Sequence, residues 1–134
     1  MGLILDTSVL IRHERKRRSG EFEQFTAHGD AYISAITVSE LLVGVNLADS
    51  EDRRTRRLTF VEGLFTILPV LDFTSETARI HADIYASLRQ RGELIGAHDL
   101  IIAATALQHG YSLLTSNERE FNRVPGLQVL TTDS

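Results

Sequence analysis

The stretch "LILDTSVLI", residues 3–11, places a carboxylate inside the most apolar part of the N-terminal sequence. Three aliphatic residues lead into Asp6, two hydroxyl residues follow, and a second aliphatic run begins. Burying an uncompensated charge is costly, so this acid needs either a partner or a place at the rim of the core. The aliphatic residues 3–5 predict a short strand, and a helix is expected from about Ser8. Asp6 is therefore expected where a strand turns into a helix.

The rest of the chain alternates between short apolar runs and amphipathic stretches. Further strands are predicted at 31–34, within the β-rich segment 65–71, at 111–117 and at 127–130, and helices at 22–27, 37–48, 52–65, 74–92 and 100–110. The helix at 100–110 is nearly all apolar, so it should be buried on more than one side. Strands separated by helices predict a parallel sheet covered on both faces, because parallel neighbours need crossover connections. No linker or repeat interrupts the chain, so residues 1–134 are expected to form one α/β domain.

The composition limits the class of protein and the kind of metal site. The chain has 134 residues, of which 43% are hydrophobic and 24% are charged, as in ordinary globular proteins. No apolar run approaches the roughly 20 residues of a membrane-spanning helix, and no signal peptide is recognisable, so a cytoplasmic protein is expected. The absence of cysteine from the sequence excludes disulfides and thiolate ligands. A hard cation with oxygen ligands is the metal that this composition favours.

Acidic residues recur at the boundaries between the predicted elements. Glu40 follows the second strand, Asp99 opens the apolar helix, and Asn117, Glu118 and Glu120 follow the strand at 111–117. If these strands are parallel, the turns that follow them share one edge of the sheet. Carboxylates that converge there repel one another unless a cation or protons neutralise them.

Each of these residues also has a purely structural explanation, which the residues alone leave open. Asp6 can cap the helix that follows it, and Thr37 with Glu40 has the spacing of a capping box. Asp99 can simply favour the positive end of a helix. Glu118 and Glu120 can be surface residues, and His98 can be a solvated or capping histidine.

The net charge of −4 does not favour a general polyanion binder, but basic residues cluster at 12–18 and 53–57. These clusters are either solvated helix faces or surfaces that hold phosphate groups. The candidate RNA-binding residues are Arg12, Arg15, Arg17, Arg18, Arg53 and Arg54.

Four blocks of the sequence carry a resemblance to a known family. "LILDTSVLI", "TVSELLVGV", "AHDLIIAATAL" and "SLLTSNEREFNRVPGLQVL" stand in the order and approximate spacing of the PIN-domain family, and the chain resembles its VapC-type toxin ribonucleases. The resemblance implies a three-layer α/β/α sandwich with a parallel sheet of about five strands. It also implies a magnesium- or manganese-dependent endoribonuclease, the toxin of a type II toxin-antitoxin pair. The implied partners are an antitoxin, an RNA substrate and a second copy of the chain.

The resemblance assigns roles to individual residues. Asp6, Glu40 and Asp99 match the acidic metal site, with Asp6 and Asp99 as the principal ligands. Asn117 stands where many PIN domains have an aspartate, so it adds a neutral oxygen but no charge, and Glu120 matches an acid of the toxin branch that can complete the catalytic set. Thr7, Ser8 and Thr115 match small hydroxyl positions that would orient a ligand or water.

The implied reaction is hydrolysis of a phosphodiester in tRNA, rRNA or mRNA by a metal-activated water, which leaves a 5'-phosphate and a 3'-hydroxyl. Two alternatives remain. One is a magnesium-binding phospho-acceptor domain of the receiver type, although such a domain normally has a lysine late in the chain and Lys16 is the only lysine here. The other is a PIN domain that binds RNA without cutting it.

Overall fold

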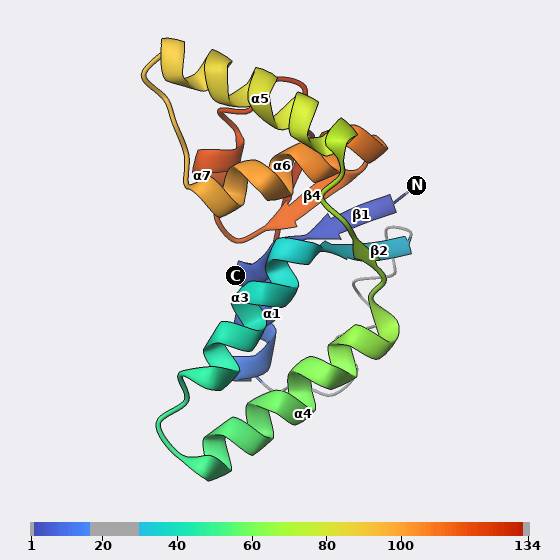
Figure 1. Ribbon diagram of the computed structural model, residues 1–134, viewed down its shortest axis with the longest axis vertical. Coiled ribbons are helices and arrows are strands. Elements are labelled where there is room, and N and C mark those ends of the chain that lie inside the picture. Colours follow the sequence, from blue (N-terminus) through green and yellow to red (C-terminus); the bar gives the residue numbers. More distant parts are fainter. Residues whose placement is uncertain (1, 17–29, 133–134) are drawn as a thin grey trace.

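Five parallel strands form a single sheet in the computed structural model, which describes residues 2–16 and 30–132 (Figure 1). The strands are β1 (Gly2–Leu5), β2 (Asp30–Ser34), β3 (Val70–Leu71), β4 (Ser112–Thr115) and β5 (Val129–Thr131). Their order across the sheet is β3-β2-β1-β4-β5, so β1 lies at the centre. The chain builds one side of the sheet outward from β1 and then the other. The turn that follows β1 is therefore at the topological switch point, where ligand sites form in open parallel sheets.

Helices cover both faces of the sheet, which confirms the predicted three-layer α/β/α sandwich (Figure 1). One layer holds α1 (Thr7–Lys16), α3 (Ala35–Asn46) and α4 (Glu51–Ile67), and the other holds α5 (Ser75–Gln90), α6 (Ala97–His109) and the short α7 (Glu118–Phe121). None of the helices in the described ranges combines the length and the apolar character needed to cross a bilayer.

The side chains of β1 show how the sheet separates two cores. Leu3 and Leu5 pack into the cluster shared with α1, α3 and α4, whereas Ile4 packs into the cluster shared with α5, α6 and α7. This division follows from the alternation of side chains along a strand. All three side chains are at most 1% exposed, so the strand is buried on both faces, as its unbroken aliphatic run predicts.

Helix α6 behaves as its apolar sequence predicts. It contacts α5 on one side and β1, β2 and β4 on the other, and residues 102–106 are all buried. It ends at Gly110, whose φ of 69° lies in the left-handed region that glycine adopts without strain. The predicted end of this helix at glycine is confirmed.

The structure corrects two predicted boundaries. Helix α3 begins at Ala35 rather than at residue 37, because Ser34 is its N-cap and accepts a hydrogen bond from the N–H of Ile36 at 3.3 Å. The segment 65–71 is only partly β, because α4 continues through Ile67 and packs Val61 and Leu64 into the core. Pro69 then disfavours helical geometry at the preceding residue, so only residues 70–71 form a strand. The helix predicted at 22–27 lies outside the described residues.

We predict that the two cores dominate the stability of the domain. Leu113 of β4 is fully buried, so Leu113→Ala should lower the free energy of unfolding by about 2 to 5 kcal/mol through lost burial and the cavity left behind. Leu47 is 77% exposed, so the matched Leu47→Ala should change it by about 0.5 kcal/mol or less. Urea denaturation of both variants measures the difference. Similar losses in the two variants would contradict the assigned core.

Candidate active site

Asp6 is held at the carboxyl edge of the sheet by the pairing of β1 with β4. Leu5 pairs with Leu114, and the N–H of Asp6 donates to the carbonyl of Leu114 at 2.9 Å, so Asp6 lies beside Thr115. The side chain of Asp6 is buried, and its Oδ2 accepts hydrogen bonds from Thr115 Oγ1 at 2.8 Å and from Ser8 Oγ at 2.6 Å. These two hydroxyls compensate the burial of the carboxylate. Two of the three predicted supporting hydroxyl residues therefore contact Asp6 directly.

Glu40 reaches from α3 toward two other elements. Its Oε1 accepts a hydrogen bond from Thr7 Oγ1 at 2.6 Å, and its Oε2 lies 3.2 Å from His98 Nδ1. Thr37 is fully buried and its hydroxyl lies 3.0 Å from that of Thr7. The capping-box explanation for Thr37 and Glu40 is wrong, because α3 begins earlier and Glu40 lies in its second turn. The carboxylate instead faces α1 and the start of α6.

The pKa of Asp99 is affected by the three other acids of the predicted set. Its pKa is raised from 3.8 to about 7, first by burial and next by the charge of Asp6. Hydrogen bonding with Glu120 and the charges of Glu120 and Glu40 raise this pKa further. Each of these influences disfavours the ionised form of Asp99. Asp6, Glu40 and Glu120 therefore lie near enough to act on Asp99, although the four residues come from the β1–α1 turn, α3, α6 and α7.

Asn117 occupies a different environment from the four acids. It is exposed at the N-cap position of α7, where its side chain makes no capping hydrogen bond. Its backbone N–H donates to Thr115 Oγ1 at 2.8 Å, which links it to Asp6 through that hydroxyl. Its assignment as a neutral metal ligand stays a prediction.

The described arginines proposed for RNA binding make different contacts. Arg12 Nη1 donates to Thr132 Oγ1 at 3.4 Å, whereas Arg53 pairs with Asp49 at 3.0 Å and Arg54 pairs with Glu51. Arg53 and Arg54 lie in the first turn of α4, at the far end of that helix from the sheet (Figure 1). Arg17, Arg18 and the side chain of Arg15 lie outside the described residues. A role of these arginines in RNA binding stays a prediction.

His98 is a site residue that the sequence did not reveal. The explanation of His98 as a capping residue is wrong, because α6 has Gly96 as its N-cap and no side-chain capping bond, whereas the explanation as a solvated residue agrees with a side chain that is 53% exposed. Its hydrogen-bond partner, Glu40, is 58 positions away in the sequence. Its position next to Asp99 was the only signal in the sequence that could have pointed to it.

The donor chemistry of the site fits a hard divalent cation. Asp6, Asp99 and Glu120 offer carboxylate oxygens, the ligands that Mg²⁺ prefers. Their mutual repulsion is relieved by a proton on Asp99, and a cation in the same place would relieve it without that proton. Among residues 2–16 and 30–132, no three acidic or histidine side chains already surround a metal position.

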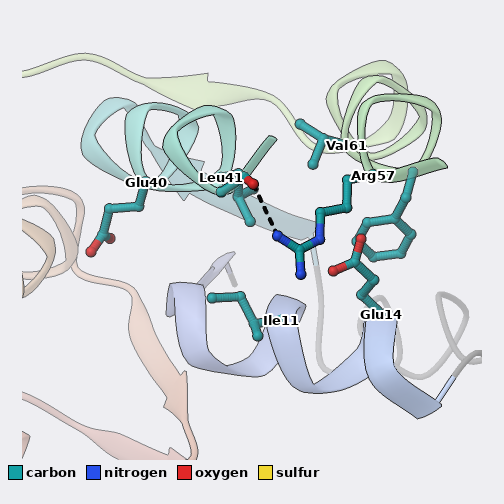
Figure 2. Close-up of a pocket in the computed structure, with 8 residues that line it drawn as sticks. Ile11, Glu14, Glu40, Leu41, Arg57 and Val61 are labelled. Atoms are coloured by element: carbon teal, nitrogen blue, oxygen red, sulfur yellow. Dashed lines mark hydrogen bonds between the residues drawn. The ribbon is translucent and has the colours of Figure 1, made fainter. Parts of the chain in front are cut away.

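A pocket of about 190 Å³ lies beside Glu40, between α1, α3 and α4 (Figure 2). It is lined by Ile11, Glu14, Glu40, Leu41, Gly44, Arg57, Phe60 and Val61. Arg57 Nη1 donates to the carbonyl of Gly44 at 3.0 Å. Figure 2 shows Glu40 at the other end of the pocket, with its carboxylate directed away from Arg57. Glu40 therefore stands at the border between this pocket and the acidic site.

The profile of the PIN domain matches residues 3–127. The chain belongs to the PIN-domain family. The likeness extends over the whole of this PIN domain: a Rickettsia felis protein named Ribonuclease VapC1 is 44% identical over 134 residues, which is 100% of this chain and 98% of that protein. A Shigella flexneri protein named tRNA(fMet)-specific endonuclease VapC is 32% identical over 127 residues, with 94% of each chain covered.

Solved structures show the same fold. A VapBC2 complex from Rickettsia felis, bound to a DNA fragment from its promoter, contains a chain that matches this PIN domain with a TM-score of 0.89 at 25% identity. The match covers 99% of this chain and 100% of that one. A DNA-bound VapBC from Salmonella typhimurium matches with a TM-score of 0.88 at 31% identity, and 98% of each chain is covered. The resemblance of the sequence to VapC-type PIN domains is confirmed.

The raised pKa of Asp99 predicts a pH-dependent gain in stability from neutralising this residue. In metal-free buffer at pH 8, wild-type Asp99 is ionised against the surrounding acids, so Asp99→Asn should raise the unfolding midpoint. At pH 5 Asp99 is protonated in the folded protein but still ionised in the unfolded chain, so the gain should be smaller than at pH 8 and should vanish only below the ordinary pKa of 3.8. Thermal unfolding with chelator at the two pH values measures this.

Asp83→Asn, at an exposed position of α5, is the control and should show no such difference between pH 5 and pH 8. A gain for Asp99→Asn that is equal at both pH values would contradict the electrostatic explanation.

Proposed function

We propose that this PIN domain is a Mg²⁺- or Mn²⁺-dependent endoribonuclease that acts in the cytoplasm as the toxin of a type II toxin-antitoxin pair. The observation that carries the proposal is the convergence of Asp6, Glu40, Asp99 and Glu120 at the carboxyl edge of the sheet. Such a set of acids has no evident structural use, because its mutual repulsion opposes folding. The names of its relatives, Ribonuclease VapC1 and tRNA(fMet)-specific endonuclease VapC, support this activity.

The surroundings of each site residue suggest the role that we propose for it. A bound divalent ion would supply positive charge to the phosphate and make water a better nucleophile at neutral pH. Asp6 is the best-fixed ligand, because Ser8 and Thr115 hold its Oδ2 and neither of these bonds uses Oδ1. Asp99 and Glu120 would complete the carboxylate set, and Asn117 would add a neutral oxygen. A carboxylate of this set can also accept the proton that the attacking water loses.

The proposed substrate is a phosphodiester of structured RNA. Water forms a bond to phosphorus, the bond from phosphorus to the 3'-oxygen breaks, and a proton passes to that leaving oxygen. The products carry a 5'-phosphate and a 3'-hydroxyl. The Shigella relative's name makes tRNA the first substrate to test, with rRNA and mRNA as the alternatives.

The proposed protein partner is a cognate antitoxin, since the solved relatives include VapBC toxin-antitoxin complexes. We place its contact at the pocket between α1, α3 and α4, because apolar side chains of Ile11, Leu41 and Val61 line it and Glu40 stands at its border. A segment bound there would lie next to the acidic site and would hinder RNA. A second copy of the chain is the other proposed partner.

We predict RNA cleavage that depends on both the metal and Asp6. The purified wild type should cut total tRNA with Mg²⁺ or Mn²⁺ and stop on addition of chelator, because the carboxylates cannot bind the phosphate without a cation. Asp6→Asn should abolish cleavage and leave the fold intact, since the amide has the same shape but no charge. Mapping of product ends by sequencing and circular dichroism of the variant provide the measurements.

Asp83→Asn on exposed α5 is the matched control and should cut as the wild type does. Cleavage by Asp6→Asn at the wild-type rate would refute the metal-site assignment. Metal binding by the wild type without any cleavage would favour an RNA-binding PIN domain that does not cut.

We predict that the pocket and the nuclease activity can be separated by mutation. Ile11 lines the pocket and is 39% exposed, so Ile11→Glu should prevent copurification with the antitoxin and leave RNA cleavage unchanged. Val43 is exposed on α3 and is not among the residues that line the pocket, so Val43→Glu is the control and should still copurify. Coexpression with a tag on the antitoxin measures this. Retention of the antitoxin by Ile11→Glu would exclude the pocket as its site.

A further inference from the structure

We propose that His98 is a positioning residue that orients the carboxylate of Glu40 at the acidic site. The inference rests on the proposed function and adds a residue to it. Its basis is the contact of His98 Nδ1 with Glu40 Oε2 at 3.2 Å, which joins the start of α6 to α3. His98 does not cap α6, because Gly96 is the N-cap of that helix.

The first turn of α6 serves the site with two successive residues. Side chains one position apart on a helix are separated by about 100° around the axis, so they face different neighbours. Asp99 interacts with Asp6 and Glu120, whereas His98 faces α3 and meets Glu40. One helical turn therefore supplies an acid to the site and holds a second acid in place.

Both oxygens of the Glu40 carboxylate are engaged by different elements. Thr7, at the start of α1, donates to Oε1 at 2.6 Å, and His98 meets Oε2 from α6. Because a carboxylate accepts hydrogen bonds, the proposed contact requires a hydrogen on Nδ1 of His98. With Thr7 alone the carboxylate could turn about its terminal torsion, since such torsions are soft. With both donors its plane is fixed.

The contact also ties together the two helical layers at the site. Thr7 and Glu40 belong to the layer of α1 and α3, whereas His98 and Asp99 belong to the layer of α6. The charge of Glu40 acts on Asp99 across this junction and helps to raise its pKa. The distance between these two acids, and the field that a metal ion would meet, therefore depend on where Glu40 is held.

The test compares two substitutions of His98, to asparagine and to glutamine, whose side-chain amides place a hydrogen-bond donor at different positions. In His98→Asn the amide nitrogen can take the place of Nδ1, whereas in His98→Gln it extends toward the place of Nε2. His98→Leu offers no donor. Because the His98 side chain is 53% exposed, all three variants should keep the wild-type unfolding midpoint.

We predict that His98→Leu and His98→Gln weaken Mn²⁺ binding, measured by isothermal titration calorimetry, and lower kcat, each about 10-fold or more, with KM for RNA unchanged. His98→Asn should retain most of the wild-type Mn²⁺ affinity and kcat. Removing His98 in a Glu40→Ala background should have no further effect, because the group that it orients is already gone. Wild-type Mn²⁺ affinity and kcat in His98→Leu would overturn the proposal, as would a loss confined to KM.

A second measurement does not depend on cleavage. Nitrogen-15 NMR of the imidazole distinguishes the two tautomers, and His98 should carry its hydrogen on Nδ1 in the wild type and shift toward Nε2 in Glu40→Ala. A wild-type His98 with its hydrogen on Nε2 would overturn the proposal even if the protein cuts RNA. A wild type that neither binds Mn²⁺ nor cuts RNA would refute the proposed function, and the tautomer would then show separately whether the contact exists.

Discussion

The parallel pairing of β1 with β4 fixes the Asp6 carboxylate in a buried position at the end of the central strand. Because Leu5 pairs with Leu114, Asp6 must lie beside Thr115 at the end of the central strand. Two hydroxyls make this burial tolerable, but they leave the negative charge in place. The other acids lie near this carboxylate, and burial of Asp99 followed by the charge of Asp6 raises the pKa of Asp99.

The site is assembled from both helical layers, so its geometry depends on how the two cores pack against the sheet. Asp6 and Thr7 follow the central strand, Glu40 comes from one layer, and Asp99 and Glu120 come from the other. Two separate hydrophobic clusters, one on each face, hold these elements at fixed separations. Acids that repel one another can therefore be kept close, because their separation would require the sandwich itself to loosen. A cation or a proton is the less costly way to relieve the repulsion.

The main acids could be predicted because three of them follow from one rule: residues just beyond the ends of parallel strands share an edge of the sheet. Asp6, Glu40 and Glu120 satisfy this rule, and Asp99 was found at the start of an apolar helix. Glu40 also matched a local capping box, and the start of α3 at Ala35 decided against it. The β-forming residues at 65–67 predicted a strand, but burial of Val61 and Leu64 keeps this segment in α4. Tertiary packing outweighed local propensity at residues 65–67, whereas a different local cap, Ser34, decided the start of α3.

By itself the sequence determined the α/β class, the parallel sheet, the buried first strand and the acids at the edge of the sheet, because these follow from periodicity and from the order of strands and helices along the chain. Only the tertiary structure decided what each acid touches. These contacts join side chains that are mostly far apart in the sequence. Ser8 and Thr115 contact Asp6, Thr7 and His98 contact Glu40, and Glu120 contacts Asp99. Such contacts depend on how the two helical layers are placed against the sheet, and no local pattern of residues encodes that placement.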